Sequence, residues 1–339
     1  MKKDLSIIIP YIQEYPQILF TIRSIHEQLK DIDHEIIAVD NLCPPAIEQL
    51  KSRGKTIDKG HKNTKKDGSI QNSHIKSMSE VKGNEWLKYI YYEDHFSHWQ
   101  AKNEALRQSK SDFIMFIDAH CVPSHNSIPN MYKYYVENWE ELNGSIHLPL
   151  TYHILESRKL IYQLIYDKEI HKCEYSFSSM PKQDIFEVPC MSSCGMMLHK
   201  SFFDKVGLFP QTGIYSGGEH FLNFVSSIIG RKKWIYAKDG ALLHHHGEKR
   251  DYHYTWGCYQ YNRIVANYMF GGEKWARYFV NNLKISEKDR EKLFQKVVSV
   301  EANQKQREKI KKQQVINIED WAEEWVEKWE YKWKNEWKS

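Results

Sequence analysis

The sequence predicts an α/β fold, with a mixed, mostly parallel central sheet flanked by helices and a helical C-terminal extension. The first observation is a β-branched run, Leu5–Tyr11, followed by a helix and a second strand in the order of a parallel βαβ unit. The second is residues 113–117, five apolar residues between Asp112 and Asp118, which are typical of a strand buried on both faces. The third is size: 339 residues with 41% hydrophobic content suffice for one large domain or two small ones.

Strands and helices alternate through the first 150 residues. Apolar residues at helical intervals predict a helix over 16–29, and a β-branched run ending in a carboxylate predicts a strand over 34–41. No G-x-G-x-x-G loop follows the first strand, so a Rossmann dinucleotide site is not expected. The other elements expected in this half are strands over 87–92, 113–117 and 144–150 and helices over 99–108 and 128–139.

Residues 51–84 interrupt this alternation with lysines set among glycine, serine, asparagine and histidine. The segment has few apolar residues, so we interpret it as a solvated, mobile insertion. The alternative is an arm that binds a polyanion, such as the phosphates of a nucleic acid.

The composition shifts at about residue 151 toward aromatic and polar residues without a clean period, which favours a region built for binding. Residues 190–198 lead into a short helix over 200–206, and a further helix is expected over 221–229. Paired glycines ahead of Glu219 allow a ligand to approach the backbone closely. A strand that begins at Ala241 ends in three consecutive histidines, residues 244–246.

The tail carries a regular series of tryptophans: Trp321, Trp325, Trp329, Trp333 and Trp337. A helix has 3.6 residues per turn, so a period of four winds this stripe slowly round the axis. We expect the stripe to pack on the protein or on its copy in a homo-oligomer. Interfacial membrane anchoring is the alternative, although the nearly balanced charges of the polar face weaken attraction to anionic lipids.

Charge, cysteine content and hydropathy place only weak limits on the binding partners and the cellular location of the protein. The net charge of +4 neither demands nor excludes a nucleic acid or a membrane surface. The six cysteines contain no C-x-x-C pair, which favours reduced thiols. No apolar run approaches the ~18 residues that span a bilayer, and no long signal segment is seen. We therefore expect a cytoplasmic protein without a transmembrane segment.

Asp118 and His120 follow the most apolar strand directly. Ligands of open α/β sheets bind beyond the carboxyl ends of the strands, and residues i and i+2 of an extended segment point the same way. A carboxylate oxygen and an imidazole nitrogen suit manganese, zinc or iron better than calcium. An ordinary turn in which Asp118 caps the next segment is the alternative, but the histidines at 244–246 favour a metal site.

Several segments together resemble family 2 glycosyltransferases of the GT-A fold. The resemblance covers about residues 4–250 and rests on 6–11, 35–41, 101–106, 113–120, 195–198, 206–209, 218–219 and 244–247, in the order of that family. The central turn of the family is usually Asp-x-Asp. Here it is Asp118-Ala119-His120, which resembles the Asp-x-His of polypeptide N-acetylgalactosaminyltransferases, as does the Gly-Gly-Glu of residues 217–219.

The resemblance implies a set of site residues and cofactors. A divalent cation, expected to be Mn²⁺, would bridge the donor phosphates as a Lewis acid. Its expected ligands are Asp118, His120 and His244, with His246 on the same strand face as the alternative. The donor, expected to be a UDP-sugar, would be bound by Tyr11, Asp40, Lys102, Asp118, Gly195 and Gly218. Glu219 or His220 would serve as the base that deprotonates an acceptor hydroxyl.

We therefore expect a metal-dependent glycosyltransferase that moves a hexosyl or pentosyl group to a hydroxyl of a glycan, a lipid-linked sugar or a protein. One alternative acceptor is a hydroxylated base in viral DNA, and a second alternative is a non-catalytic sugar- or nucleic-acid-binding module. Residues 1–270 would form the GT-A domain, with a nucleotide-sugar half (1–120) and an acceptor half (121–270). Residues 271–339 would form the helical extension.

Overall fold

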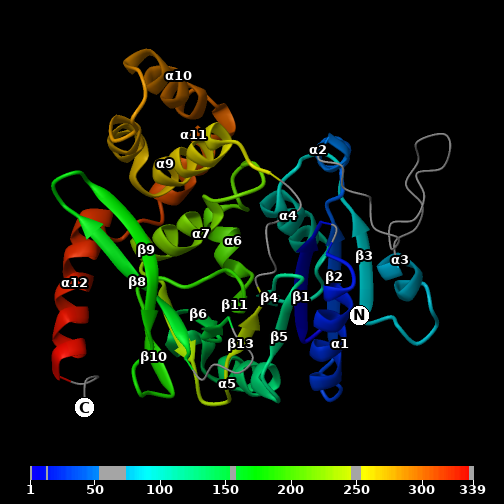
Figure 1. Ribbon diagram of the computed structural model, residues 1–339. Coiled ribbons are helices and arrows are strands. Elements are labelled where there is room, and N and C mark those ends of the chain that lie inside the picture. Colours follow the sequence, from blue (N-terminus) through cyan, green and yellow to red (C-terminus); the bar gives the residue numbers. More distant parts are fainter. Residues whose placement is uncertain (1, 13, 53–73, 153–157, 246–252, 336–339) are drawn as a thin grey trace.

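The computed structural model describes residues 2–12, 14–52, 74–152, 158–245 and 253–335 (Figure 1). The strands of its central sheet are β1 (Leu5–Tyr11), β2 (His34–Asp40), β3 (Leu87–Tyr91), β4 (Phe113–Phe116), β6 (Gly144–His147), β10 (Ile185–Glu187), β11 (Met196–His199) and β12 (Lys232–Tyr236). Their order is β10-β12-β6-β11-β4-β1-β2-β3. The run from β4 to β3 is parallel, whereas β11 is antiparallel to both of its neighbours. The expected mixed, mostly parallel sheet is thereby confirmed.

Helices cover both faces of this sheet because its central strands are apolar on both sides. α1 (Gln17–Gln28) and α5 (Ser127–Leu142) pack on the face that receives Ile7 and Met115. The opposite face receives Ile8 and Phe116, and α4 (His98–Gln108) packs there. Alternate residues of one strand therefore feed two separate cores, as a period of two requires.

A second sheet of five strands stands beside the first, and part of it was not expected. Its strands are β5 (Cys121–Pro123), β7 (Leu150–Thr151), β8 (Leu160–Asp167), β9 (Lys172–Ser179) and β13 (Leu242–His244), in the order β5-β13-β7-β8-β9. The description of the region after residue 151 as aperiodic was wrong, because β8 and β9 form a long antiparallel hairpin. The expected strand over 144–150 is also divided, and its two ends, β6 and β7, belong to different sheets.

Short helices connect these strands, and a group of longer helices follows them. The first set comprises α2 (Pro44–Ser52), α3 (His74–Ser79), α6 (Ser201–Val206), α7 (Gly218–His220), the π-helical turn η2 (Phe221–Val225) and α8 (Ser226–Ile228). The second comprises α9 (Trp256–Asn281), α10 (Glu287–Val298), α11 (Glu301–Lys311) and α12 (Ile318–Asn335). α9, α10 and α11 pack together at the top of Figure 1. Most of the lysine-rich insertion, residues 53–73, lies outside the described residues.

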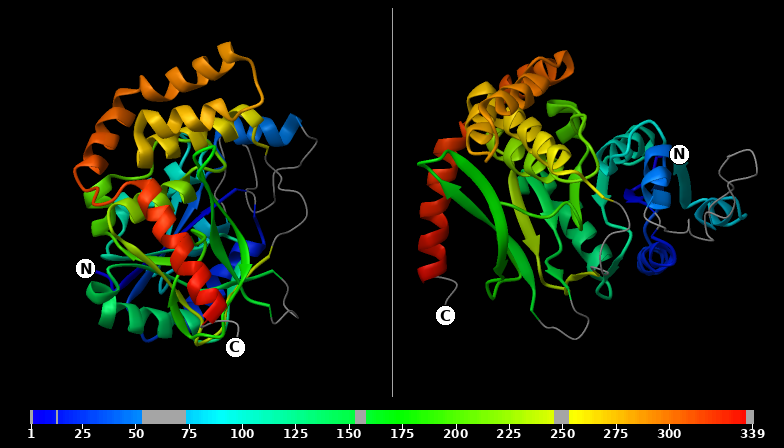
Figure 2. Two further views of the ribbon diagram at one scale, coloured as in Figure 1. Left: turned by 90° about the vertical axis from the view of Figure 1, so that its left-hand side faces the viewer. Right: turned by 45° about the horizontal axis from the view of Figure 1, so that its top comes forward.

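α12 carries the tryptophans of the tail and lies along β8 (Figure 2). Trp325 is only 6% exposed, and the Trp321 ring meets Phe224 edge-on with centroids 6.1 Å apart. The ammonium group of Lys233 lies 5.3 Å from the centroid of the Trp321 ring. The described part of the stripe therefore packs on its own chain, whereas assembly into a homo-oligomer stays a prediction. Trp337 lies outside the described residues.

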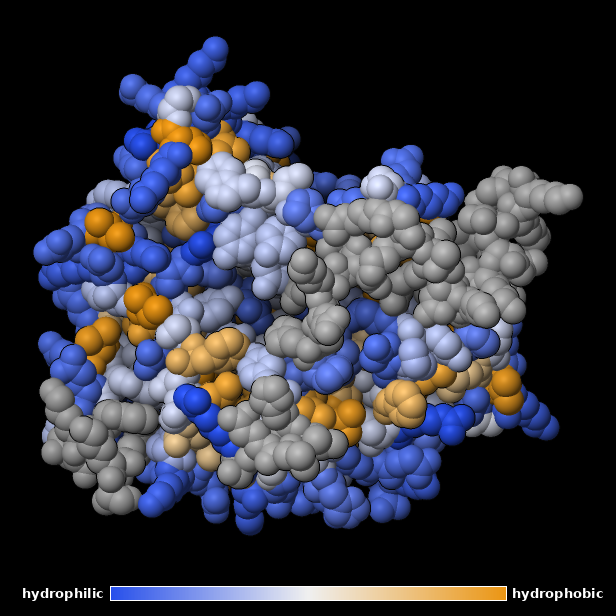
Figure 3. All heavy atoms as spheres, viewed as in Figure 1, coloured by the Kyte–Doolittle hydropathy of each residue, from blue (hydrophilic) through white to orange (hydrophobic). Residues whose placement is uncertain are grey.

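The expected boundary at residue 270 falls inside α9, which continues to Asn281 with a non-helical residue at Gly272. The division into domains stays a prediction. Among the described helices, none is long and apolar enough to cross a bilayer. On the face seen in Figure 3, hydrophobic residues form small separate groups between hydrophilic ones.

Candidate functional site

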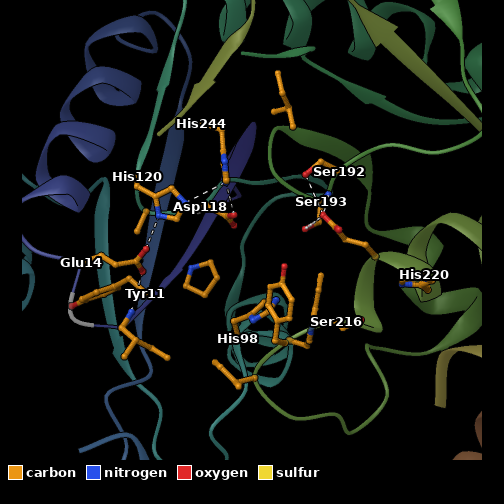
Figure 4. Close-up of a pocket in the computed structure, with 18 of the residues that line it drawn as sticks. Tyr11, Glu14, His98, Asp118, His120, Ser192, Ser193, Ser216, His220 and His244 are labelled. Carbon is orange, nitrogen blue, oxygen red and sulfur yellow. Dashed lines mark hydrogen bonds and ion pairs between the residues drawn. The ribbon is translucent and has the colours of Figure 1, made fainter. Parts of the chain in front are cut away.

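A cavity of about 360 Å³ opens where the carboxyl ends of β1 and β4 meet the second sheet. Asp118 and His120 enter it from the turn after β4, and His244 enters from the end of β13. Tyr11, at the end of β1, lines it as well. Figure 4 shows the two histidines and Asp118 gathered on one side of this cavity, with Tyr11 below them.

Sheet pairing explains why His244 reaches residues more than 120 positions earlier in the chain. β13 pairs antiparallel with β5 so that His244 lies opposite Cys121, the residue after His120. The His244 Nε2 atom lies 3.2 Å from the His120 Nε2 atom and 3.2 Å from the Asp118 Oδ2 atom. One ligand atom from each of the three residues lies within 4.8 Å of the other two. His246, the alternative ligand, lies outside the described residues.

The chemistry of this group fits a divalent cation. Two imidazole nitrogens and one carboxylate oxygen suit manganese, iron or zinc. Burial by itself raises the pKa of Asp118, but the hydrogen bond with His244 and the charge of Lys102 hold the pKa of this carboxyl well below its usual range. The Asp118 and His120 side chains stay 32% and 21% exposed to the cavity, so a cation held there keeps positions for ligands from solution.

Glu14 supports His120 from the loop after β1. Its Oε1 atom lies 2.6 Å from the His120 Nδ1 atom, and its Oε2 atom accepts a hydrogen bond of 3.2 Å from the Ile12 backbone. A carboxylate on one ring nitrogen orients an imidazole and directs the other nitrogen toward a metal. Sequence reasoning did not single out Glu14, because an isolated acid in a loop carries no spacing signal.

Glu219, the first candidate base, lines the cavity and accepts four hydrogen bonds. Its Oε1 atom accepts from the Ser193 backbone at 2.8 Å, the Ser193 hydroxyl at 3.2 Å and the Ser192 hydroxyl at 3.1 Å. Its Oε2 atom accepts from the Tyr175 hydroxyl at 2.9 Å. The carboxylate is therefore oriented before any substrate arrives.

His220, the other candidate base, faces a different group. Its Nε2 atom lies 2.9 Å from the Glu174 Oε2 atom, and Glu174 also pairs with Arg263. Burial lowers the pKa of the His220 imidazole. In Figure 4, His220 lies on the far side of the site from His120 and beyond Ser192. Both Glu219 and His220 line the cavity, and which of the two acts as the base stays a prediction.

The glycine Gly218 is required by close packing at the start of α7. A Cβ atom added there would lie 2.2 Å from the ring of Trp99, which lines the cavity. Gly217 precedes it with a φ of 84°, a conformation that favours glycine. Gly195, the other glycine expected to bind the donor, is not among the residues that line the cavity. Its backbone N–H donates a hydrogen bond of 2.8 Å to the Phe116 carbonyl.

Two other expected donor-binding residues lie beneath the surface of the cavity. Lys102 is fully buried, with its Nζ atom 3.3 Å from the Ser193 hydroxyl and 4.4 Å from the centroid of the Trp99 ring. Asp40 is also fully buried and accepts hydrogen bonds from the Leu42 backbone at 3.0 Å and from the Tyr89 hydroxyl at 3.1 Å. Their contact with a donor stays a prediction.

Aromatic residues of β8 and β9, together with Tyr152 directly after β7, form one wall of the cavity. Tyr152 meets His244 edge-on with centroids 5.6 Å apart, and Tyr162 stacks on Tyr175 at 4.8 Å. Phe177 also lines the cavity and is 49% exposed. Sequence reasoning missed this wall, yet a signal was present: Tyr162, Leu164 and Tyr166 alternate with the other residues of β8, the period of a half-buried strand.

A comparison with protein-family models supports one class of enzyme. Residues 67–207 match the model of Glycosyl transferase family 2, which supports a glycosyltransferase. The match covers less than half of the chain. Together with the mixed central sheet and its flanking helices, it confirms the expected GT-A fold.

A search of solved structures matches S. aureus TarS at low identity. The TarS 1-349 structure in complex with UDP-GlcNAc has 11% identity and a TM-score of 0.49, covering 87% of this chain and 71% of that chain. The TarS 1-349 structure in complex with UDP has 10% identity and a TM-score of 0.49, covering 87% and 70%. No curated protein matches the chain.

Proposed function

We propose that the protein is a metal-dependent glycosyltransferase that moves a sugar from a UDP-sugar to the hydroxyl group of an acceptor glycan, lipid-linked sugar or protein. The observation that carries the proposal is the convergence of Asp118, His120 and His244 at the cavity edge. The match of residues 67–207 to a glycosyltransferase family supports the reaction class. Mn²⁺ is the proposed cation, because the ligand set combines oxygen with nitrogen.

Asp118, His120 and His244 would hold the cation, with Glu14 orienting His120. Such a cation supplies Lewis-acid stabilisation of the charge that develops on the departing diphosphate. The acceptor hydroxyl attacks the anomeric carbon, the bond from this carbon to the phosphate oxygen breaks, and its electron pair leaves with UDP. Glu219 takes the proton of the hydroxyl, because its carboxylate lines the same cavity and is held there by hydrogen bonds.

The acceptor would lie along the aromatic wall. Phe177 and Tyr162 meet at a centroid distance of 5.0 Å and offer apolar ring surfaces to the apolar face of a sugar ring. Glu174 and the serine hydroxyls of residues 192 and 193 line the same cavity and can bond sugar hydroxyls.

The test is a panel of nucleotide sugars, scored by thermal shift and by transfer, with and without Mn²⁺. A donor that binds the native state should raise the melting temperature, and Mn²⁺ should enhance the shift. In Asp118→Asn we expect transfer to fall by a factor of about 10² or more. Asp112→Asn is the matched control, since Asp112 precedes the other end of β4, is 49% exposed and should leave transfer unchanged.

Equal transfer by Asp118→Asn and the wild-type protein would refute the role of the cation site. A wild-type protein that binds no donor in the presence of Mn²⁺ would instead favour a non-catalytic module. Transfer to a hydroxylated base in duplex DNA, with steep salt dependence, would identify the nucleic-acid acceptor.

A further inference from the structure

Two buried thiols lie close to His244, one of the three proposed cation ligands. Cys121 begins β5 immediately after His120, and Cys194 lies two residues before β11. Their Sγ atoms are 3.2 Å apart, and the two residues are 0% and 2% exposed. The β5–β13 pairing places His244 opposite Cys121, so an imidazole accompanies the two sulfur atoms.

Cys121, Cys194 and His244 have the composition of a site for a soft metal ion. One ligand atom from each residue lies within 4.8 Å of the other two, and all three residues are buried. Thiolate and imidazole ligands suit zinc and related ions, whereas manganese is usually bound with carboxylate oxygen, which this group lacks. His244 belongs to this group and also to the group with Asp118 and His120.

We propose that Cys121, Cys194 and His244 form a second metal site that binds Zn²⁺ or a similar thiophilic ion and competes with the Asp118–His120–His244 site for His244. Binding exchanges the two thiol protons for two metal–sulfur bonds, and the protons pass to solvent. Of the three residues only His244 lines the cavity, so an ion would have to pass His244 to reach the buried thiols. The competition rests on the proposed function, whereas occupation of the thiol site does not.

The binding test uses the full chain, kept reduced and freed of metal by chelation. Titration with Cd²⁺ should produce thiolate-to-metal charge-transfer absorption at one equivalent. Cys121→Ser and Cys194→Ser should each lose this absorption and weaken binding by roughly tenfold or more. Cys43→Ser is the matched control, because Cys43 is equally buried but belongs to a separate apolar cluster and should retain the wild-type signal.

X-ray absorption spectroscopy of the wild-type protein with one equivalent of Zn²⁺ removes the dependence on variant folding. We expect two sulfur scatterers in the zinc shell. A shell of nitrogen and oxygen alone would overturn the proposal, as would unchanged Cd²⁺ absorption in both serine variants.

The competition is tested by Zn²⁺ inhibition of Mn²⁺-dependent transfer. We expect Cys121→Ser and Cys194→Ser to need roughly tenfold more Zn²⁺ for the same inhibition as the wild-type protein and Cys43→Ser. Equal sensitivity in all four proteins would overturn the competition, since zinc would then act at Asp118 and His120. The absorption experiments need no sugar transfer, so failure of the proposed function would be distinguishable from failure of this site.

Discussion

Replacing Gly218 with alanine should distort the candidate site through one contact. The added Cβ atom would lie 2.2 Å from the Trp99 ring, far inside van der Waals contact. Trp99 cannot easily retreat, because it is 2% exposed, packs on Phe209 at a centroid distance of 5.0 Å and carries the Lys102 ammonium over its ring. Overpacking of this kind costs about 1–3 kcal/mol of unfolding free energy. Because Trp99 lines the cavity, donor affinity should fall together with stability.

The assay combines urea unfolding with donor titration, and Gly257→Ala supplies the control. Gly257 lies in the first turn of α9, where an added Cβ atom would meet nothing within 4 Å. Alanine there should be neutral or stabilising by up to about 1 kcal/mol, because it favours the helix. If Gly218→Ala were as stable as Gly257→Ala and bound the donor normally, the argument that this glycine is required by Trp99 would be refuted.

The remaining predictions concern a metal ligand, acid stability and the tail. Glu14→Ala should weaken Mn²⁺ binding by about 10–100-fold in calorimetry, because His120 loses its orienting carboxylate. The control is Glu85→Ala, at an exposed residue, which should bind Mn²⁺ normally. Equal Mn²⁺ affinities of the two variants would contradict the role of Glu14 in orienting His120. Burial lowers the pKa of His147 from 6.5 to about 4. As the pH falls through this range, His147 is therefore protonated in the unfolded chain before it is protonated in the folded protein. The stabilisation of the folded state that comes from this difference in pKa, about 3 kcal/mol, is therefore present above pH 6.5 and is lost as the pH falls toward 4. In urea unfolding at several pH values, the free energy of unfolding of His147→Met should fall less steeply over this range than that of the wild-type protein. Identical slopes would refute this. Trp325→Ala should cost about 3–5 kcal/mol on thermal unfolding, since Trp325 is 6% exposed, whereas the exposed Tyr331→Ala should cost little; equal effects would show that α12 does not pack as described.

The parts of the fold that could be predicted are those where the local sequence pattern is compatible with only one type of secondary structure. The expected strands at Leu5–Tyr11 and Phe113–Ile117 and the first helix agree closely with β1, β4 and α1, because continuous apolar runs and helical spacing are strong local signals. The hairpin β8–β9 was missed because tyrosine, serine and glutamate occupy many of its positions. Its aromatic residues lie in a cavity wall as well as in a core, which weakens a pattern judged on hydrophobicity alone.

The candidate site was predictable residue by residue only in part. Asp118 and His120 stood out because polar groups ended a buried strand, and the structure brings His244 to them through the β5–β13 pairing. That pairing is long-range, so only the clustering of three histidines and the family resemblance linked the two segments beforehand. The roles of Glu14, Tyr175 and the serines that hold Glu219 depend on tertiary contacts between segments far apart in the chain, which spacing along one sequence cannot reveal.

The Lys102 ammonium interacts electrostatically with both Asp118, a proposed cation ligand, and Glu219, the proposed base. Burial lowers the pKa of its ammonium group, and the nearby carboxylates of Asp118 and Glu219 raise it. The ammonium thus offsets the negative charge of both carboxylates beneath the cavity. A cation held by Asp118 would add positive charge beside Lys102, which leaves Glu219 as the main group that stabilises the buried ammonium. If a cation binds at Asp118, its binding would therefore be coupled to the charge of Glu219 through Lys102, whose side chain does not line the cavity.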